Sequence, residues 1–475
     1  MNQPSDIPPS PEPAPIGPSR SEKITLYFAL ASLVFVAVGS AYLLVAPLLG
    51  ARPVAAAPTV LGLSAPTLIQ GRVLDAGGGT PLQGASVWAG ETEVVTDADG
   101  RFILGPLPLP AAVTIKRPGY ERKRLALDAA EPTLTLDRQV IRAAYLTYYG
   151  VADKGIRGRV LDLVARTELN AVVIDIKGDR GLIPYRTGVE AALESGAQGP
   201  VIIKDFEQLL ASFKAQGVYT IARIVVFKDN VLASHRPDLA VIDTRTGKPW
   251  IDREGLAWVD PFQEEVWDYN IAVAKEAVLK GFDEIQFDYV RFPTDGRLGA
   301  ARYSQPNTSA TRLPAIAAFL AKARRELGPT GAYLAADLFG YTAFNANDTE
   351  IGQRIEELSP HLDYICPMVY PSGYHLGIPG YRNPVEHPYE IVRESVKLIR
   401  QRSQSPVAVV RPWIQDFRDY AFDRRPFGAR EIRAQIKGAI ESGAQGWMLW
   451  NPRNDYTAEA LQPKAGGLSA KRSPD

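Results

Sequence analysis

Cysteine and histidine are scarce in this 475-residue chain, and the few present do not match the sites that these residues usually build. The one cysteine, Cys366, has no partner for an intramolecular disulfide, so cysteine pairing says nothing about the redox compartment. The four histidines show neither HxH nor HExxH spacing, which argues against a histidine-built zinc site. We therefore predict no bound metal and no cofactor.

A net charge of either sign is also lacking. Lys plus Arg number 53 and Asp plus Glu number 53, so the chain has no overall basic character that would attract nucleic acid. We therefore expect no nucleic-acid partner. The length, by contrast, exceeds that of one ordinary domain and predicts two or three.

The first part of the chain carries a long uncharged run after a polar arm. Residues 1–23 are rich in Pro and Ser and predict a disordered arm. The run 24–49 holds 26 residues without a charge, more than the roughly 20 needed to cross a bilayer. Basic residues precede it, which favours a single-pass helix with the bulk of the protein outside the cytoplasm. A cleaved signal peptide is the main alternative, and a buried core helix is a third.

A second pattern occupies residues 66–137, where short alternating runs are separated by turn sequences such as AGGGTPLQG and DADG. Six or seven short strands in this space predict a small β-sandwich. Gly71–Val73, Pro81–Val87 and Thr96–Phe102 resemble the carboxypeptidase regulatory-like domain. That resemblance implies a transthyretin-like sandwich serving as a spacer or binding module.

From residue 141 to 455, apolar strand-like runs alternate with amphipathic helical segments. The expected strands are 141–148, 171–176, 218–227, 282–289, 332–339, 362–370, 407–413 and 445–451. Near-continuous apolar strands indicate burial on both faces, and eight strand–helix units predict a (β/α)8 TIM barrel. An open doubly wound sheet is the alternative, but no GxGxxG or GxxxxGK[ST] follows any strand. Residues 462–475 predict a disordered tail.

Polar and aromatic side chains gather where these strands end, which is where a (β/α)8 barrel builds its active site. The mixture of carboxylates, cations and aromatic rings suits a sugar, because rings stack on pyranose faces and charged groups bind hydroxyls. We predict that the following residues contact the substrate: Asp175, Lys177, Arg223, Arg291, Tyr370, Arg411, Trp413, Gln415, Trp450 and Asn451.

Asp288 and Asp337 are the predicted catalytic pair. Glycoside hydrolysis needs two carboxyl groups, and each of these ends a strand, on two strands expected to be neighbours. In a retaining scheme Asp288 attacks the anomeric carbon, while Asp337 protonates the leaving oxygen and then activates water. Arg223 or Arg291 would keep the nucleophile ionised. Asp175 has two alternatives, a catalytic role or an ion pair with Lys177 two residues on. The sequence does not fix the distance between the two carboxyls, so retaining and inverting geometries both stay open.

Long motifs in this region resemble a bacterial glycoside hydrolase-like family that was long catalogued as a domain of unknown function. The motifs include NAVVIDIKGDRGLIPY, YTIARIVVFKDNVLA, GFDEIQFDYVRFPTDG, DYICPMVYPSGY and GWMLWNPRNDYT, and the resemblance covers 141–455. It implies a barrel distantly similar to α-galactosidases and α-amylases, whose nucleophile at the end of strand 4 falls on Asp288. The acid of those enzymes lies at the end of strand 5 or strand 6. It would fall on Asp337 of strand 5 here, because strand 6 ends in Tyr370 and offers no carboxylate.

The sequence therefore predicts a membrane-anchored O-glycosyl hydrolase of the bacterial cell membrane, acting on a polysaccharide or oligosaccharide outside the cytoplasm. One alternative is an inactive carbohydrate-binding or scaffold protein of the cell envelope. Another is a metal-dependent hydrolase in which Asp175, Asp288 and Asp337 are oxygen ligands.

Overall fold

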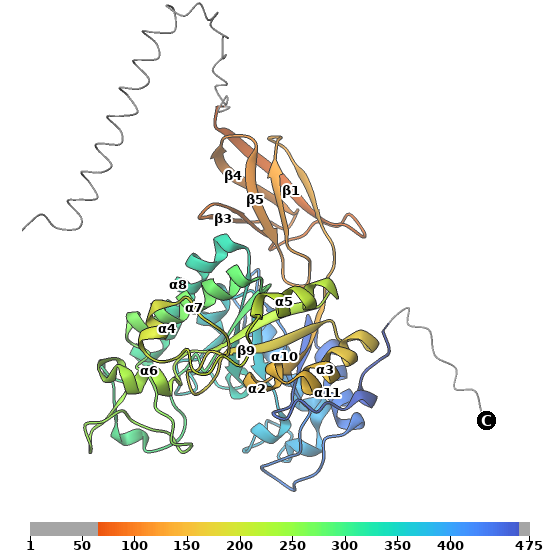
Figure 1. Ribbon diagram of the computed structural model, residues 1–475. Helices are drawn as coiled ribbons and strands as arrows, with labels where there is room; N and C mark the ends of the chain where they lie inside the picture. Colours follow the sequence, from red (N-terminus) through yellow and green to blue (C-terminus); the bar gives the residue numbers. More distant parts are fainter. Residues whose placement is uncertain (1–64, 465–475) are drawn as a thin grey trace, which may run out of the picture. The chain divides into compact units, whose positions relative to one another are not determined.

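A computed structural model describes residues 65–464 as a β-rich N-terminal domain followed by a closed barrel (Figure 1). The predicted arm and membrane span, residues 1–23 and 24–49, lie outside the described residues, as does most of the predicted tail. Within the part that is described, no helix combines the length and apolar character needed to cross a bilayer.

The N-terminal domain consists of two sheets. One has the order β4–β1–β7 and the other β3–β2–β5–β6. The strands are β1 (Thr67–Asp75), β2 (Ser86–Ala89), β3 (Thr92–Val95), β4 (Arg101–Leu107), β5 (Ala111–Lys116), β6 (Lys123–Leu127) and β7 (Thr133–Leu136). Buried and exposed residues alternate along β1 and β4, so each strand turns one face toward a shared apolar core. The predicted β-rich domain is confirmed.

The barrel strands are parallel and close on themselves, because β18 pairs with β8 and β14 pairs with β15. They are β8 (Ile141–Leu146), β9 (Ala171–Lys177), β10 (Tyr219–Val225), β12 (Glu284–Asp288), β14 (Tyr333–Phe339), β15 (Tyr364–Met368), the split strand β16 (Val409–Val410) and β17 (Trp413–Gln415), and β18 (Gly446–Trp450). Counting the split strand once gives the eight strands of a (β/α)8 barrel, as predicted.

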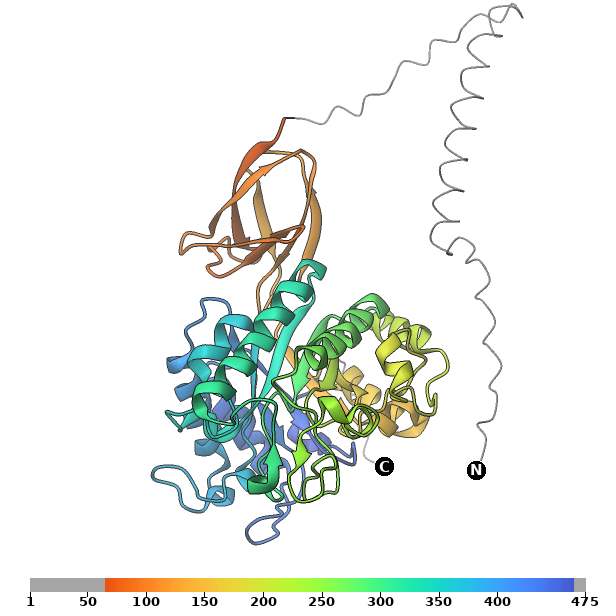
Figure 2. The ribbon, with the colours of Figure 1, turned by 90° about the vertical axis from the view of Figure 1, so that its left-hand side faces the viewer.

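Helices surround these strands in both views (Figures 1 and 2). The longer ones are α3 (Lys154–Arg166), α5 (Phe206–Ala215), α7 (Glu264–Lys280), α8 (Ser309–Leu327), α10 (Pro388–Arg402) and α11 (Ala429–Glu441). Only the short α9 (Ile355–Leu358) precedes β15, in the gap where the sequence pattern was weakest. One large apolar cluster lies between strands and helices, and a separate, smaller one fills the barrel interior.

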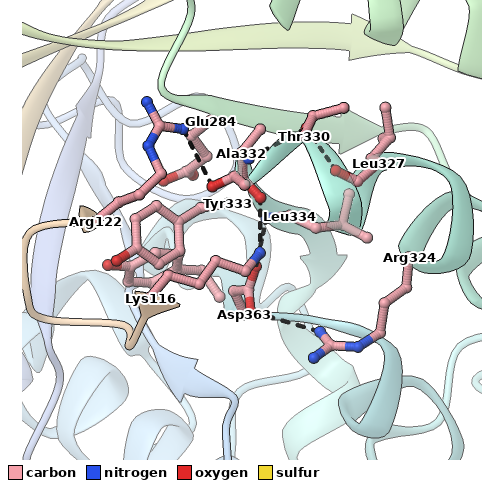
Figure 3. A network of polar contacts seen from close by, with 12 residues as sticks. Lys116, Arg122, Glu284, Arg324, Leu327, Thr330, Ala332, Tyr333, Leu334 and Asp363 are labelled. Carbon is pink, nitrogen blue, oxygen red and sulfur yellow. Dashed lines mark hydrogen bonds and ion pairs between the residues drawn. The ribbon is translucent and has the colours of Figure 1, made fainter. Parts of the chain in front are cut away.

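The two domains share a fully buried ion pair. Nζ of Lys116, at the end of β5, lies 2.6 Å from Oδ2 of Asp363 and donates to the carbonyl of Ala332 at 2.7 Å (Figure 3). Asp363 directly precedes β15, so this contact lies at the N-terminal end of the barrel strands. Arg324 of α8 approaches the same carboxylate at 3.5 Å.

Two further contacts join the N-terminal domain to the barrel. The ring of Trp88 on β2 lies against Gly328, where a Cβ atom would be 2.2 Å from the indole. Arg324 also forms an ion pair with Glu93 of β3. The N-terminal domain therefore packs directly on the barrel, at the end opposite to the carboxyl termini of its strands.

Candidate active site

Four charged side chains meet at the carboxyl ends of four neighbouring barrel strands. Asp175, Arg223, Asp288 and Asp337 come from β9, β10, β12 and β14, which lie side by side in this order. The register places Arg223 opposite Asp175, and Val225 opposite Asp288. The structure thus brings together the two predicted catalytic carboxylates and two of the predicted substrate-binding residues.

Arg223 is the centre of this group. Its Nη1 donates to Oδ1 of Asp175 at 2.6 Å, and its Nε donates to Oδ2 of Asp288 at 2.9 Å. Nη2 forms a further short bond to Asp288. The same Nε lies 3.8 Å from Oδ2 of Asp337. Because the 2.9 Å and 3.8 Å contacts share Nε, the two Oδ2 atoms of the predicted pair are at most 6.7 Å apart.

Asp337 differs from its neighbours in how its two oxygens are used. Oδ1 accepts a hydrogen bond from the indole Nε1 of Trp413 at 2.6 Å, whereas the buried Oδ2 has no hydrogen-bond partner. The residue is 1% exposed. Burial, followed by the negative charge of Asp288, raises the pKa of Asp337 well above its ordinary value. Burial and the neighbouring negative charge thus both favour the neutral form of this carboxyl.

Both oxygens of Asp288 accept hydrogen bonds. One oxygen accepts the two guanidinium bonds, and the other accepts the backbone N–H of Tyr289. Tyr289 has a φ of 49°, in the left-handed region that non-glycine residues rarely adopt, directly after the strand. This backbone turn brings the N–H of Tyr289 back onto the carboxylate.

Asp175 is fixed from two sides. Arg223 donates to one of its oxygens and the hydroxyl of Tyr145 to the other. Burial raises the pKa of Asp175 in spite of the arginine. The ring of Tyr145 stacks on Trp450 with centroids 4.0 Å apart, and the guanidinium of Arg223 lies 5.1 Å from the Trp450 ring. Tyr145 was not among the predicted site residues, because it lies inside strand β8 and not at its end.

Aromatic rings surround this group. Trp450 and Tyr370 are half-buried, and Tyr370 packs edge-on against Phe417. Phe417 in turn stacks with the exposed Tyr420. Burial and the nearby charge of Asp337 raise the pKa of Tyr370. Trp450 and Tyr370 thus lie where they were predicted, while Phe417 and Tyr420 come from a loop whose position the strand pattern did not indicate.

Lys177 does not join the group, in contrast to the prediction that it faces the same way as Asp175. A register shift between β9 and β10 places Ile224 opposite Lys177, although Arg223 pairs with Asp175. The irregularity turns the next side chain to the other face of the sheet. Lys177 instead forms a fully buried ion pair with Asp229 and lies 5.3 Å from the ring of Tyr269 on α7.

Arg411 is also placed away from the group. The seventh barrel strand consists of β16 and β17, and Arg411 lies in the break between them. It therefore lies deeper in the barrel than a residue at a strand end. It forms a fully buried ion pair with Glu284 and lies 4.0 Å from the ring centroid of Tyr364. The prediction that Arg411 contacts substrate is not met in this structure.

Three further predicted contacts have structural partners. Trp413 is buried and holds Asp337, so it positions a carboxyl and does not present a ring to a sugar. Gln415 binds the backbone of Ser372 and the carbonyl of Phe417. The amide nitrogen of Asn451 donates to the carbonyl of Asp455. All three are buried.

The metal-ligand alternative does not fit this arrangement. A cation that bound Asp175, Asp288 and Asp337 together would occupy the place of the Arg223 guanidinium, which already contacts all three. Among residues 65–464 no group of three or more His, Cys, Asp or Glu side chains has an arrangement suited to a metal.

Comparisons with known proteins agree with this architecture. The sequence model of the family described as "Putative glycosyl hydrolase domain" matches residues 143–456, and that of the carboxypeptidase regulatory-like domain matches residues 68–140. No curated protein matches the chain. Both family resemblances predicted from the sequence are confirmed.

Several solved structures are similar. A hypothetical protein from Ruminiclostridium thermocellum ATCC 27405 is 39% identical, with a TM-score of 0.37, over 41% of this chain and 96% of that one. The PgaB (BpsB) glycoside hydrolase domain from Bordetella bronchiseptica is 14% identical, with a TM-score of 0.48, over 66% and 95%. A chitinase from Chromobacterium violaceum ATCC 12472 is 12% identical, with a TM-score of 0.39, over 67% and 96%.

Proposed function

This chain belongs to the family described as a putative glycosyl hydrolase domain, and from that premise we propose that its barrel cleaves glycosidic bonds with Asp337 as general acid and Asp288 as nucleophile. The substrate is a polysaccharide or oligosaccharide. Arg223 fixes Asp288 by two hydrogen bonds, and the aromatic rings of Trp450 and Tyr370 line the approach of the sugar.

One observation carries the proposal, namely the difference in environment between two neighbouring carboxyls. Asp288 accepts two hydrogen bonds from a guanidinium and one from a backbone N–H. Asp337 has a raised pKa and a buried oxygen without a partner. A carboxyl that favours its neutral form beside one that is fixed by a cation provides an acid and a nucleophile in one site.

The geometry favours a retaining reaction. The two Oδ2 atoms lie at most 6.7 Å apart, which includes the roughly 5–5.5 Å of retaining enzymes and reaches only the lower limit for inverting ones. In the first step a carboxylate oxygen of Asp288 forms a bond to the anomeric carbon. The bond between that carbon and the leaving oxygen breaks, and the leaving oxygen takes the proton of Asp337. In the second step Asp337 removes a proton from water, whose oxygen displaces Asp288 from the anomeric carbon.

The test is a screen of a glycan panel with the fragment 66–461, beside the variants Asp288→Asn and Asp337→Asn. A matched control is Asp455→Asn, which changes an exposed carboxylate near the same loops. We expect hydrolysis by the wild type and the control, and its loss in both active-site variants, with sugar binding retained. Following the anomeric proton of the first product by NMR then distinguishes retention from inversion. Undiminished turnover by Asp288→Asn would refute the assignment.

A second candidate function is carbohydrate binding without catalysis, and burial of the carboxyls favours it. The side chains of Asp288 and Asp337 are 6% and 1% exposed, so a sugar reaches them only after neighbouring side chains move. A binding protein of the cell envelope would retain glycan affinity in both Asn variants and would turn over no glycan in the panel.

We also propose that residues 24–49 anchor the protein in the bacterial cell membrane, with the barrel outside the cytoplasm and a transthyretin-like sandwich between them. The uncharged run and the basic residues before it support this proposal. The test compares the full chain with a chain that starts at residue 50. We expect the full chain in the membrane fraction after carbonate washing and the shortened chain outside it. Proteolysis of the barrel from the cytoplasmic side alone would contradict the orientation.

A further inference from the structure

One cation beside the proposed active site has no negative partner among residues 65–464. Arg291 follows β12 by three residues and is half-buried. Its Nη1 donates to the carbonyl of Phe292 at 3.0 Å and contacts the hydroxyl oxygen of Thr294 at 3.5 Å. Within residues 65–464 it has no carboxylate within ion-pair distance, and its Nε and Nη2 have no protein acceptor.

Two aromatic rings hold this guanidinium in place. It lies 4.8 Å from the ring centroid of Tyr289 and 5.3 Å from that of Trp258. The two rings themselves meet edge to face at 5.7 Å. Such stacking restricts a planar guanidinium while leaving the donors on its edge free. A partly buried cation without a counter-ion is unfavourable unless a ligand supplies the negative charge.

The neighbouring lysine does not share this property. Lys228 also lies over the ring of Tyr289, at 5.2 Å, but its ammonium group contacts Asp252 at 3.1 Å and Glu254 at 2.7 Å. Its charge is thus compensated within the protein. The uncompensated positive charge on this side of Tyr289 belongs to Arg291.

Tyr289 connects Arg291 with the catalytic group. Its backbone N–H donates to Asp288, and its ring is in contact with the guanidinium of Arg291. The charges of both Asp288 and Arg291 act on its hydroxyl, whose pKa is raised chiefly by burial. Arg291 is therefore linked to the proposed nucleophile through a single residue, Tyr289.

We propose that Arg291 forms a subsite for an oxyanion substituent of the substrate, so that the protein prefers an acidic glycan. The substituent is a carboxylate, as in a uronic acid, or a sulfate ester. Both present oxygens that a guanidinium fork binds in a bidentate manner. This inference rests on the proposed function for the identity of the neighbouring site, but its test does not depend on catalysis.

The experiment measures binding to the full-length protein carrying Asp288→Asn, by calorimetry, at two salt concentrations. The probes are an oligogalacturonate, its methyl ester, a sulfated neutral oligosaccharide and the same oligosaccharide without sulfate. We expect at least one acidic probe to bind about tenfold more tightly than its neutral counterpart, and this preference to weaken at higher salt. Whether the uronate or the sulfated probe shows the preference identifies the substituent.

The variants Arg291→Gln and Arg291→Lys, added to the same background, locate the effect. We expect Gln to remove the preference for the acidic probe and Lys to retain part of it, because an ammonium keeps the charge without the fork. Arg253→Gln, which removes an exposed arginine from the nearby loop, is the matched control and should leave the preference unchanged. Equal binding of acidic and neutral probes, or a preference that survives Arg291→Gln, overturns the proposal. Acid-selective binding by a protein that hydrolyses nothing would instead refute only the proposed catalysis.

Discussion

Replacing Lys116 with Met should destabilise the protein by about 3 kcal/mol, because it leaves the carboxylate of Asp363 buried without its main counter-charge. Removing one partner of a buried ion pair typically costs about 3–5 kcal/mol. The lower end applies here, since Asp363 keeps the N–H of Leu334 at 2.8 Å and the more distant Arg324 at 3.5 Å. The contact of Lys116 with the carbonyl of Ala332 is lost as well.

Urea unfolding of the fragment 66–461, followed by tryptophan fluorescence, measures this change. The double variant Lys116→Met with Asp363→Asn removes both charges but keeps a carbonyl acceptor for Leu334. We expect it to recover at least half of the lost free energy of unfolding, because the cost comes from the uncompensated charge. A loss below about 1 kcal/mol for Lys116→Met, or a double variant less stable than the single one, would refute the reasoning.

Four further predictions concern the proposed active site. Asp288→Asn should lower kcat by at least ~10³-fold on any substrate found, as measured by release of reducing sugar, with Asp455→Asn as control. The activity of the wild type should fall as the pH rises through the raised pKa of Asp337, because the acid form is then lost. The variant Asp337→Asn, assayed with an aryl glycoside whose leaving group needs no acid, should show no such decline. The same raised pKa makes the native state of the wild type lose stability as the pH rises above the ordinary range of a carboxyl, and Asp337→Asn should abolish that loss in urea titrations at several pH values. Trp413→Phe removes the hydrogen bond that lowers the pKa of Asp337, so the decline in activity should move to higher pH and kcat should fall about tenfold; an unmoved profile would mean that the indole does not act on the acid.

The barrel and its catalytic end could be predicted because both follow from local pattern. Buried parallel strands have nearly continuous apolar sequences, and a charged residue at the end of such a strand has little reason to be there except at the active end of a barrel. Asp175, Asp288 and Asp337 all satisfy this condition, and the structure brings them to one arginine. Their proximity needed only strand order, which the sequence itself supplies.

The errors came from features that the alternation of residues does not encode. Lys177 was expected beside Asp175, but a register irregularity between β9 and β10 turns it toward Asp229. Arg411 was expected at a strand end, but its strand resumes beyond it and leaves the guanidinium paired with Glu284 inside the barrel. A one-residue irregularity reverses the face of a side chain, and a break in a strand changes its depth. Both are set by contacts with neighbouring strands.

The placement of these charges accounts for the acid in the proposed active site. Inside the barrel, Glu284 and Arg411 pair one to one. At the carboxyl ends of the strands, one guanidinium faces three carboxyls, and it forms direct hydrogen bonds only with Asp175 and Asp288. The third, Asp337, is left at 3.8 Å in a buried position, where the charged form is poorly compensated. The raised pKa of Asp337 thus follows from its burial and from the excess of carboxyls over cations in this group, and a change in any one member alters the acidity of the others.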